Sequence, residues 1–425
     1  MEQKELELYF HIPFCVRKCY YCDFLSFPAQ EETKRRYMEA LFAETAGSAL
    51  SYADRTVTTV FIGGGTPSLV PVSSTERLMA LIREHYRLAE DAEVTIEINP
   101  GTASPEKLSR YRQAGINRLS IGLQSADDRE LAAIGRIHTW KQFEETFSHA
   151  RKAGFQNINV DIMGALPGQT LTGYRGTLER VLSLDRPPEH ISAYSLILEE
   201  GTVFYDRYQK GLLELPDEDT DRLIYRETEE YLSRKGYRRY EISNYAREGC
   251  ECRHNCGYWR RKDYAGFGLG AASLVENVRF RNGGDLQDYL AAPLGCREDV
   301  QRLSREEQME EFMFLGLRMT EGVSQAEFHG LFGQSIWEVY GGVIQKNIRD
   351  GLLAFVTDPG DETSGTVMIG DGNMCSNNRK SADCGVCETD SGRRHGLCSG
   401  GRLALTERGL DLSNYVMAQF LLEKG

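Results

Sequence analysis

The stretch YFHIPFCVRKCYYCDF, residues 9–24, ends a short apolar run and places three cysteines, Cys15, Cys19 and Cys22, four and three positions apart. Thiolates bind soft or redox-active metals, and four of them are needed to saturate a [4Fe–4S] cluster. Three thiolates would leave one iron open to a small chelating ligand. Three unrelated thiols, or a zinc site completed by a distant fourth ligand, are the alternatives that these residues leave open.

The spacing C-x3-C-x2-C in a loop after a first strand is the signature of radical SAM proteins, and the chain resembles them in this feature. S-adenosylmethionine (SAM) can chelate the open iron of such a cluster through its amino and carboxylate groups, and the chemistry then belongs to the cofactor. The resemblance therefore implies a [4Fe–4S] cluster held by Cys15, Cys19 and Cys22, with SAM at the remaining iron.

Downstream of this stretch, short β-branched runs alternate with helix-length segments. The expected strands cover 8–12, 59–64, 94–99, 118–124, 157–163 and 190–196, and the expected helices cover 31–50, 74–87, 105–114, 140–153 and 171–184. Such alternation produces βαβ crossovers and a parallel sheet. The predicted fold is therefore α/β, a partial (β/α)6 TIM-like barrel whose site lies at the carboxyl ends of its strands.

Polar or special residues lie at or just past the ends of five predicted strands: Cys15, the glycines 63–65, Glu97, Gln124 and Asp161. Glycines there let the backbone approach a ligand closely, since no Cβ intervenes. Buried carboxylates need hydrogen-bond donors, which the hydroxyl and ammonium groups of a nucleoside ligand would supply. Structural pairing of these carboxylates with Arg118 or Arg136 is the alternative.

Further motifs extend the resemblance over nearly the whole chain. YFHIPFC, GGGTPS, SIGLQS, DIMGALPGQT, ISAYSLILEEGT and YEISNYA together resemble the coproporphyrinogen dehydrogenase (HemN-like) family. The family can hold two SAM molecules. Matching of the motifs implies that the cluster-bound SAM contacts Tyr9, Gly64 and Glu97, and that the second position is lined by Tyr21, Gly65, Thr66, Gln124, Arg136 and Asp161.

One departure and one further motif favour a particular branch of this family. The dehydrogenases carry another cysteine two residues after the triad, where this chain has Phe24. HNCGYW at 254–259 matches the H-N-x-x-Y-W motif of the haem chaperone branch, HemW. The resemblance implies that His254 (with Asn255, Tyr258 and Trp259 in the motif) binds haem iron. A neutral imidazole is a common haem ligand, and aromatic rings stack on a flat macrocycle.

Competing haem ligands lie beside this motif, because Cys250, Cys252 and Cys256 are close to His254 in sequence. The expected organisation is a radical SAM core over 1–215, a connecting region over 216–300 and a mainly helical domain over 301–425. That last domain carries a Gly- and Cys-rich insertion at about 357–401. Four cysteines of the insertion, Cys375, Cys384, Cys387 and Cys398, could form an additional metal site.

Composition limits the classes of function. A net charge of -13 argues against general nucleic-acid binding, which requires basic patches. No signal-peptide pattern and no apolar run of membrane-spanning length is visible, so we expect a cytoplasmic protein without a transmembrane segment. Eleven cysteines in that compartment indicate metal binding, catalysis or buried thiols rather than a disulfide framework.

The function that the resemblance implies is a haem chaperone that passes haem to an unknown acceptor protein, a respiratory protein being one option. Without the further cysteine, we expect no coproporphyrinogen dehydrogenase activity. The alternatives are a radical SAM enzyme of porphyrin metabolism, either an oxygen-independent coproporphyrinogen III oxidase or a two-SAM methyltransferase, and an iron–sulfur scaffold that never binds haem.

Overall fold

The computed structural model describes residues 4–356 and 401–422. The chain forms two compact units. The first contains the residues up to 302 except 240–242 and 259–261, and the second contains these two short stretches together with the residues from 303 onward. The predicted insertion and its four cysteines lie outside the described residues, apart from Gly401.

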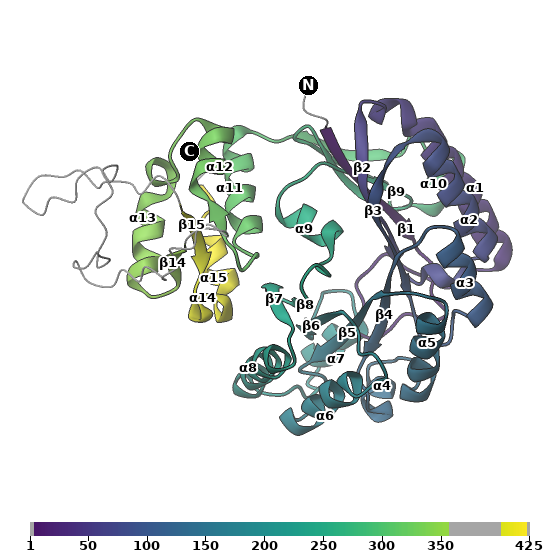
Figure 1. Ribbon diagram of the computed structural model, residues 1–425, viewed down its shortest axis with the longest axis horizontal. Coiled ribbons are helices and arrows are strands. Elements are labelled where there is room, and N and C mark those ends of the chain that lie inside the picture. The colour runs from purple at the N-terminus through teal and green to yellow at the C-terminus, as the bar shows by residue number, and fades with distance from the viewer. Residues whose placement is uncertain (1–3, 357–400, 423–425) are drawn as a thin grey trace, which may run out of the picture. The chain divides into compact units, whose positions relative to one another are not determined.

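Six neighbouring parallel strands form the centre of the first unit (Figure 1). They are β1 (Lys4–Ile12), β2 (Arg55–Gly64), β3 (Arg87–Ile98), β4 (Arg118–Gln124), β5 (Asn157–Gly164) and β6 (His190–Ser195). The main crossover helices are α1 (Glu31–Ser48), α2 (Val72–His85), α3 (Pro105–Gln113), α5 (Trp140–Lys152) and α6 (Leu171–Leu182). The predicted α/β core, with parallel strands in sequence order, is confirmed.

Burial explains why these runs form strands. All seven residues of β4 are buried, as expected for a central parallel strand that is covered on both faces. Local signals fix the helices: Thr139 and Gln142 form a reciprocal capping box at the start of α5. One large apolar core joins the strands to the helices outside them.

Residues 216–300, for which the sequence predicted only a connecting region, contribute strands to both edges of the sheet. After α7 (Val203–Gln209) and α8 (Glu218–Arg234), β7 (Arg238–Glu241) and β8 (Asn244–Ala246) extend the sheet beyond β6. At the other edge, β9 (Tyr264–Phe267) pairs with β1, followed by β10 (Ala272–Val275), β11 (Val278–Asn282) and β12 (Arg297–Arg302). The short helix α10 (Leu286–Ala291) precedes β12.

Helix α9 (Arg253–Trp259) carries the HNCGYW motif. In Figure 1 it lies on the opposite side of β1–β3 from α1 and α2. Hydrogen bonds from the motif to Thr59 on β2 and Glu93 on β3 hold it there. The motif therefore faces the concave side of the parallel sheet.

The second unit is mainly helical, as predicted. Its helices are α11 (Arg305–Gly316), α12 (Gln325–Phe332), α13 (Ile336–Arg349), α14 (Glu407–Asp411) and α15 (Ser413–Ala418). A small antiparallel sheet contains β13 (Val323–Ser324), β15 (Arg402–Leu405) and β14 (Leu353–Val356) in that order. Val356 and Arg402 are register partners, so the predicted insertion begins and ends on two paired strands.

Candidate cluster and cofactor site

One pocket at the carboxyl ends of the strands brings the predicted site together. Its lining includes Cys15, Cys19 and Cys22, and all but one of the residues expected to contact SAM: Tyr21, Gly64, Gly65, Thr66, Glu97, Gln124, Arg136 and Asp161. These residues come from the loops and strand ends of β1 to β5 and from the loop between α4 (Asp128–Ala133) and α5. Tyr9 lines a neighbouring chamber instead.

The cysteine loop is fastened at both ends. The backbone N–H of Cys15 donates to the carbonyl of Phe27 (3.1 Å), and the N–H of Phe27 donates to the carbonyl of Pro13 (2.9 Å). Within the loop, burial raises the pKa of the thiols of Cys19 and Cys22, so a positive metal centre is what would favour their thiolate forms.

The three cysteines of the triad line one pocket. Across residues 4–356 and 401–422, no three His, Cys, Asp or Glu side chains converge as ligands of one metal ion. A [4Fe–4S] cluster does not require such convergence, because each thiolate binds a different iron. The triad around one pocket therefore fits the cluster that its spacing predicts.

The glycines after β2 form a close-fitting turn beside the cysteine loop. Gly64 has a φ of +112°, which favours glycine, and its N–H donates to Oε2 of Glu97 (3.0 Å). A Cβ at Gly65 would lie 2.7 Å from the carbonyl oxygen of Phe14, which directly precedes the first cysteine. A short η2 turn (Pro67–Leu69) follows. This backbone can approach a ligand only because these positions carry no side chain.

Two buried carboxyl groups share the pocket wall. Burial raises the pKa of Glu97 to about 8, and Asp161 nearby adds to this effect. Burial also raises the pKa of Asp161, although Asn159 donates a hydrogen bond to it (2.7 Å). Hydroxyl and ammonium groups of a nucleoside could donate hydrogen bonds to these two carboxyl groups.

Gln124 and Arg136 present polar atoms to the same pocket. Gln124 adopts a left-handed φ of 70°, a strained conformation for a residue with a side chain. Its Oε1 and the Nε of Arg136 are buried and have no hydrogen-bond partner among the described residues. Such orphaned groups point to a bound polar ligand. The pocket therefore fits SAM as well as the cluster.

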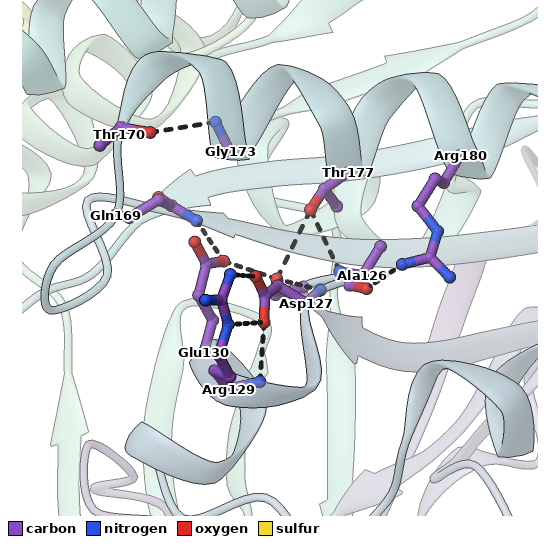
Figure 2. A network of polar contacts seen from close by, with 10 residues as sticks. Ala126, Asp127, Arg129, Glu130, Gln169, Thr170, Gly173, Thr177 and Arg180 are labelled. Atoms are coloured by element: carbon purple, nitrogen blue, oxygen red, sulfur yellow. Dashed lines mark hydrogen bonds and ion pairs between the residues drawn. The ribbon is translucent and has the colours of Figure 1, made fainter.

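A buried polar network fixes the loop that leaves Gln124 (Figure 2). The carboxylate of Glu130 accepts hydrogen bonds from Ser125 Oγ (2.6 Å) and Gln169 Nε2 (2.9 Å). The N–H of Ala126 donates to Oγ1 of Thr177 on α6 (3.1 Å). These bonds hold the segment between β4 and α5 that brings Arg136 back to the pocket.

Sequence reasoning missed two residues of this pocket. Asn99 donates to Thr66 Oγ1 (2.7 Å) and accepts from Arg136 Nη1 (2.8 Å), so it connects two predicted site residues. The phenol of Tyr194, at the end of β6, lies 3.3 Å from Gln124 Nε2. Both follow the rule that located the other residues, since each lies at the carboxyl end of a parallel strand.

A second chamber, of about 210 Å³, lies beside the first pocket. It is lined by Tyr9, Phe61, Glu97, Arg118, Ser120, Asn159, Asp161, Ser192, His254, Asn255 and Tyr258. Glu97, Ser120 and Asp161 line both spaces. The HNCGYW motif is therefore next to the cofactor pocket, separated from it by carboxyl groups that contact SAM in the predicted arrangement.

His254 is fully engaged in this chamber. Its side chain is 1% exposed, Nδ1 hydrogen-bonds with Thr59 Oγ1 (2.6 Å) and Nε2 hydrogen-bonds with Tyr258 Oη (2.9 Å). Burial, with the charge of Arg118, lowers its pKa to about 3, so the imidazole is neutral. As folded here, neither ring nitrogen is available to iron, and ligation by His254 would require one of these bonds to break.

The other motif residues divide between the two units. Asn255 and Tyr258 line the chamber, whereas Trp259 belongs to the second unit, where the Arg318 guanidinium lies 4.2 Å from its ring centroid. Of the rival cysteine ligands, Cys252 is completely buried and its pKa is raised by burial. A buried thiol with a raised pKa is a poor iron ligand until its surroundings open.

Comparison with known proteins identifies the family. The radical SAM superfamily matches residues 9–181, and the HemN C-terminal domain matches 303–356. The chain is 39% identical to "Heme chaperone HemW" of Lactococcus lactis subsp. lactis over 87% of this chain and 97% of that protein. It is also 39% identical to the protein of the same name from Bacillus subtilis, over 81% and 92%.

Among solved structures, coproporphyrinogen III oxidase (HemN) from Escherichia coli superimposes with a TM-score of 0.77 over 99% of this chain and 90% of that one, at 22% identity. This likeness shows a shared fold. Radical SAM membership implies a [4Fe–4S] cluster and SAM, which agrees with the cysteine triad and its pocket. The chain belongs to the heme chaperone HemW family, a branch of the HemN-like radical SAM proteins.

Proposed function

We propose that this protein binds haem and transfers it to an acceptor protein, using a radical SAM core that holds a [4Fe–4S] cluster and SAM. The observation that carries the proposal is the 39% identity to a heme chaperone along 97% of that relative's length. Phe24, in place of the further cysteine of the dehydrogenases, supports the same conclusion.

The residues of the pocket have distinct tasks in this proposal. Cys15, Cys19 and Cys22 hold the cluster, which with SAM supplies one-electron chemistry when bound. The Gly64 turn and the Glu97 carboxyl position the first SAM. A second SAM would contact Gln124 and Arg136, whose unpartnered buried atoms support a polar ligand there. In a chaperone these cofactors regulate haem transfer rather than convert a substrate.

His254 is the proposed haem ligand, but it is buried, so it can bind haem iron only after a local rearrangement. The imidazole is neutral, as iron ligation requires, but both nitrogens are hydrogen-bonded. Haem ligation therefore depends on release of His254 from Thr59 or from Tyr258. Because the chamber shares Glu97 and Asp161 with the cofactor pocket, occupancy of that pocket can influence this release.

We further propose that the protein acts in the cytoplasm. All seven cysteines of the described residues are free thiols, as expected in a reducing compartment. In the part of the chain that the structure describes, no helix is long and apolar enough to cross a membrane. A respiratory protein remains one option for the acceptor.

A radical SAM enzyme of porphyrin metabolism, either a coproporphyrinogen III oxidase or a two-SAM methyltransferase, is the second candidate. The match of residues 303–356 to the HemN C-terminal domain favours it. Phe24 opposes the oxidase, because the additional cysteine of the dehydrogenases is absent. An iron–sulfur scaffold without haem is a third reading, which haem titration addresses.

Two measurements on anaerobically reconstituted full-length protein separate these functions. Haem titration followed by absorbance should show saturable binding. The haem-loaded protein should then transfer its haem to an apoprotein acceptor. Incubation with reductant, SAM and coproporphyrinogen III should yield no decarboxylated product. Robust decarboxylation would show that the protein is a coproporphyrinogen III oxidase instead. Absence of haem binding would favour the iron–sulfur scaffold.

A further inference from the structure

We propose that haem first docks on the mouth of the cluster pocket, against an apolar rim formed by Val16, Phe24 and Ile137. This inference rests on the proposed function and adds a binding surface to it. The His254 ring nitrogens are enclosed in their chamber, so a haem that arrives from solvent needs an earlier point of contact. The rim supplies one beside the cofactors.

The three rim residues are unusually exposed for their type. Val16 is 56% exposed, Phe24 62% and Ile137 57%, and all three line the same pocket as the cluster cysteines. Single exposed apolar residues are normal on protein surfaces, but a group that borders a ligand pocket indicates a binding site. SAM, a charged sulfonium nucleoside, is matched by the polar residues deeper in the pocket. The rim suits a flat, apolar ligand instead.

The rim is held in place before any ligand arrives. Val16 and Phe24 lie in the cysteine loop, and Ile137 lies in the loop after α4. The two loops are joined, because Arg17 Nη2 donates to the carbonyl of Gly135 (2.7 Å) and the N–H of Tyr20 donates to the carbonyl of Ile134 (3.1 Å). A preorganised apolar surface binds a rigid ligand with little loss of conformational entropy.

The charge at the rim selects among flat ligands. Arg17 and Lys18 are exposed and line the same pocket, with Asp23 the one acidic residue of the loop from Cys15 to Phe24. On a chain with a net charge of -13, a local pair of cations favours an anionic ligand. Haem combines a flat apolar ring with two carboxylates, so it matches both the apolar rim and the two cations.

The test replaces the rim and leaves the cluster ligands intact. The Phe24→Ser/Ile137→Ser double variant, in the cluster-loaded full chain, should bind haem at least tenfold more weakly than the wild type, and Lys18→Gln should weaken binding about threefold. The matched control is Leu50→Ser, since Leu50 is 90% exposed and does not line the pocket. Its haem affinity should equal that of the wild type. Iron content per chain should be unchanged in all variants.

A reporter variant locates the haem directly. Phe24→Trp should add a fluorescence signal that bound haem quenches strongly, whereas the added signal of Leu50→Trp should be quenched much less. The proposal that haem docks on the rim would be overturned if the double variant bound haem with wild-type affinity. It would also be overturned if the added fluorescence of Phe24→Trp were not quenched in haem-saturated protein. The proposed chaperone function would stand in both cases. If the wild type bound no haem, the proposed function itself would fail, and the rim with it.

Discussion

At the scale of single residues, the glycine turn after β2 determines how closely a ligand can approach. We predict that Gly65→Ala weakens SAM binding at least tenfold, or about 1.4 kcal/mol, because the added Cβ would collide with the backbone of Phe14 beside the cysteine loop. Anaerobic equilibrium dialysis with labelled SAM measures the effect. Gly176→Ala on α6 is the control, since a Cβ there meets no atom within 4 Å. Equal SAM affinities of Gly65→Ala and the wild type would contradict a close approach of SAM to the glycine turn.

Glu7 gives a residue-scale prediction about pH. Burial raises the pKa of Glu7 to about 9, above the 4.5 of an exposed glutamate, and Oε2 has no hydrogen-bond partner among the described residues. Between these pH values the unfolded chain releases a proton that the folded chain keeps. The contribution of Glu7 to the free energy of unfolding therefore falls as pH rises, by up to ~1.4 kcal/mol per pH unit.

The measurement is the melting temperature at pH 5, 7 and 9. Relative to Glu7→Gln, the wild type should lose stability as the pH rises, because only the wild type has a buried carboxyl that resists ionisation. Glu5→Gln, at an exposed position on the same strand, should follow the wild type. Parallel curves for the wild type and Glu7→Gln would mean that Glu7 ionises freely in the folded protein. His254, 3.7 Å from Glu7, is neutral, so this contact is not an ion pair.

At the scale of elements, α9 depends on one acidic side chain of β3. The carboxylate of Glu93 accepts hydrogen bonds from the N–H groups of Arg253 (3.1 Å) and His254 (3.2 Å) at the start of the helix. A negative charge there also interacts favourably with the helix dipole. Glu93 therefore holds the element that carries the proposed haem ligand.

We predict that Glu93→Gln loosens α9 by about 1–3 kcal/mol, the usual cost of leaving buried donors poorly satisfied. Hydrogen–deuterium exchange of the amides of 253–258 should accelerate, while exchange in β4 stays unchanged. Glu90→Gln, at an exposed position on the same strand, is the matched control. If release of His254 limits haem ligation, Glu93→Gln should also bind haem faster. Unchanged exchange in α9 would show that other contacts, such as that between Thr59 and His254, hold the helix.

Elements differ in how far the sequence predicted them. The six parallel strands were predicted to within a few residues at their carboxyl ends, because β-branched runs there are bounded by helices with clear periodicity. The strands at the sheet edges were not, since each has only three to six residues, and all six residues of β12 are exposed. Their pairing depends on distant partners, which no local pattern reveals.

At the scale of the whole molecule, the rule that parallel strands end at one rim located most of the pocket. It brought together Cys15, Gly64, Glu97, Gln124 and Asp161. The same rule could have added the two missed residues, as both lie at strand ends. The rule could not have predicted that a separate chamber encloses the motif histidine. That enclosure follows from the packing of α9 on β1–β3, a contact between segments far apart in sequence.

The proposed function requires a cluster with one iron that no cysteine binds, and this requirement can be tested directly. Electron paramagnetic resonance of the anaerobically reduced protein, recorded with and without SAM, should show a [4Fe–4S]⁺ signal that SAM changes in shape. Cys19→Ser should lose this signal, and Cys296→Ser, outside the pocket, should keep it. A wild-type protein that shows no cubane signal, or one that SAM leaves unaltered, would contradict a cluster held by three thiolates and open to SAM.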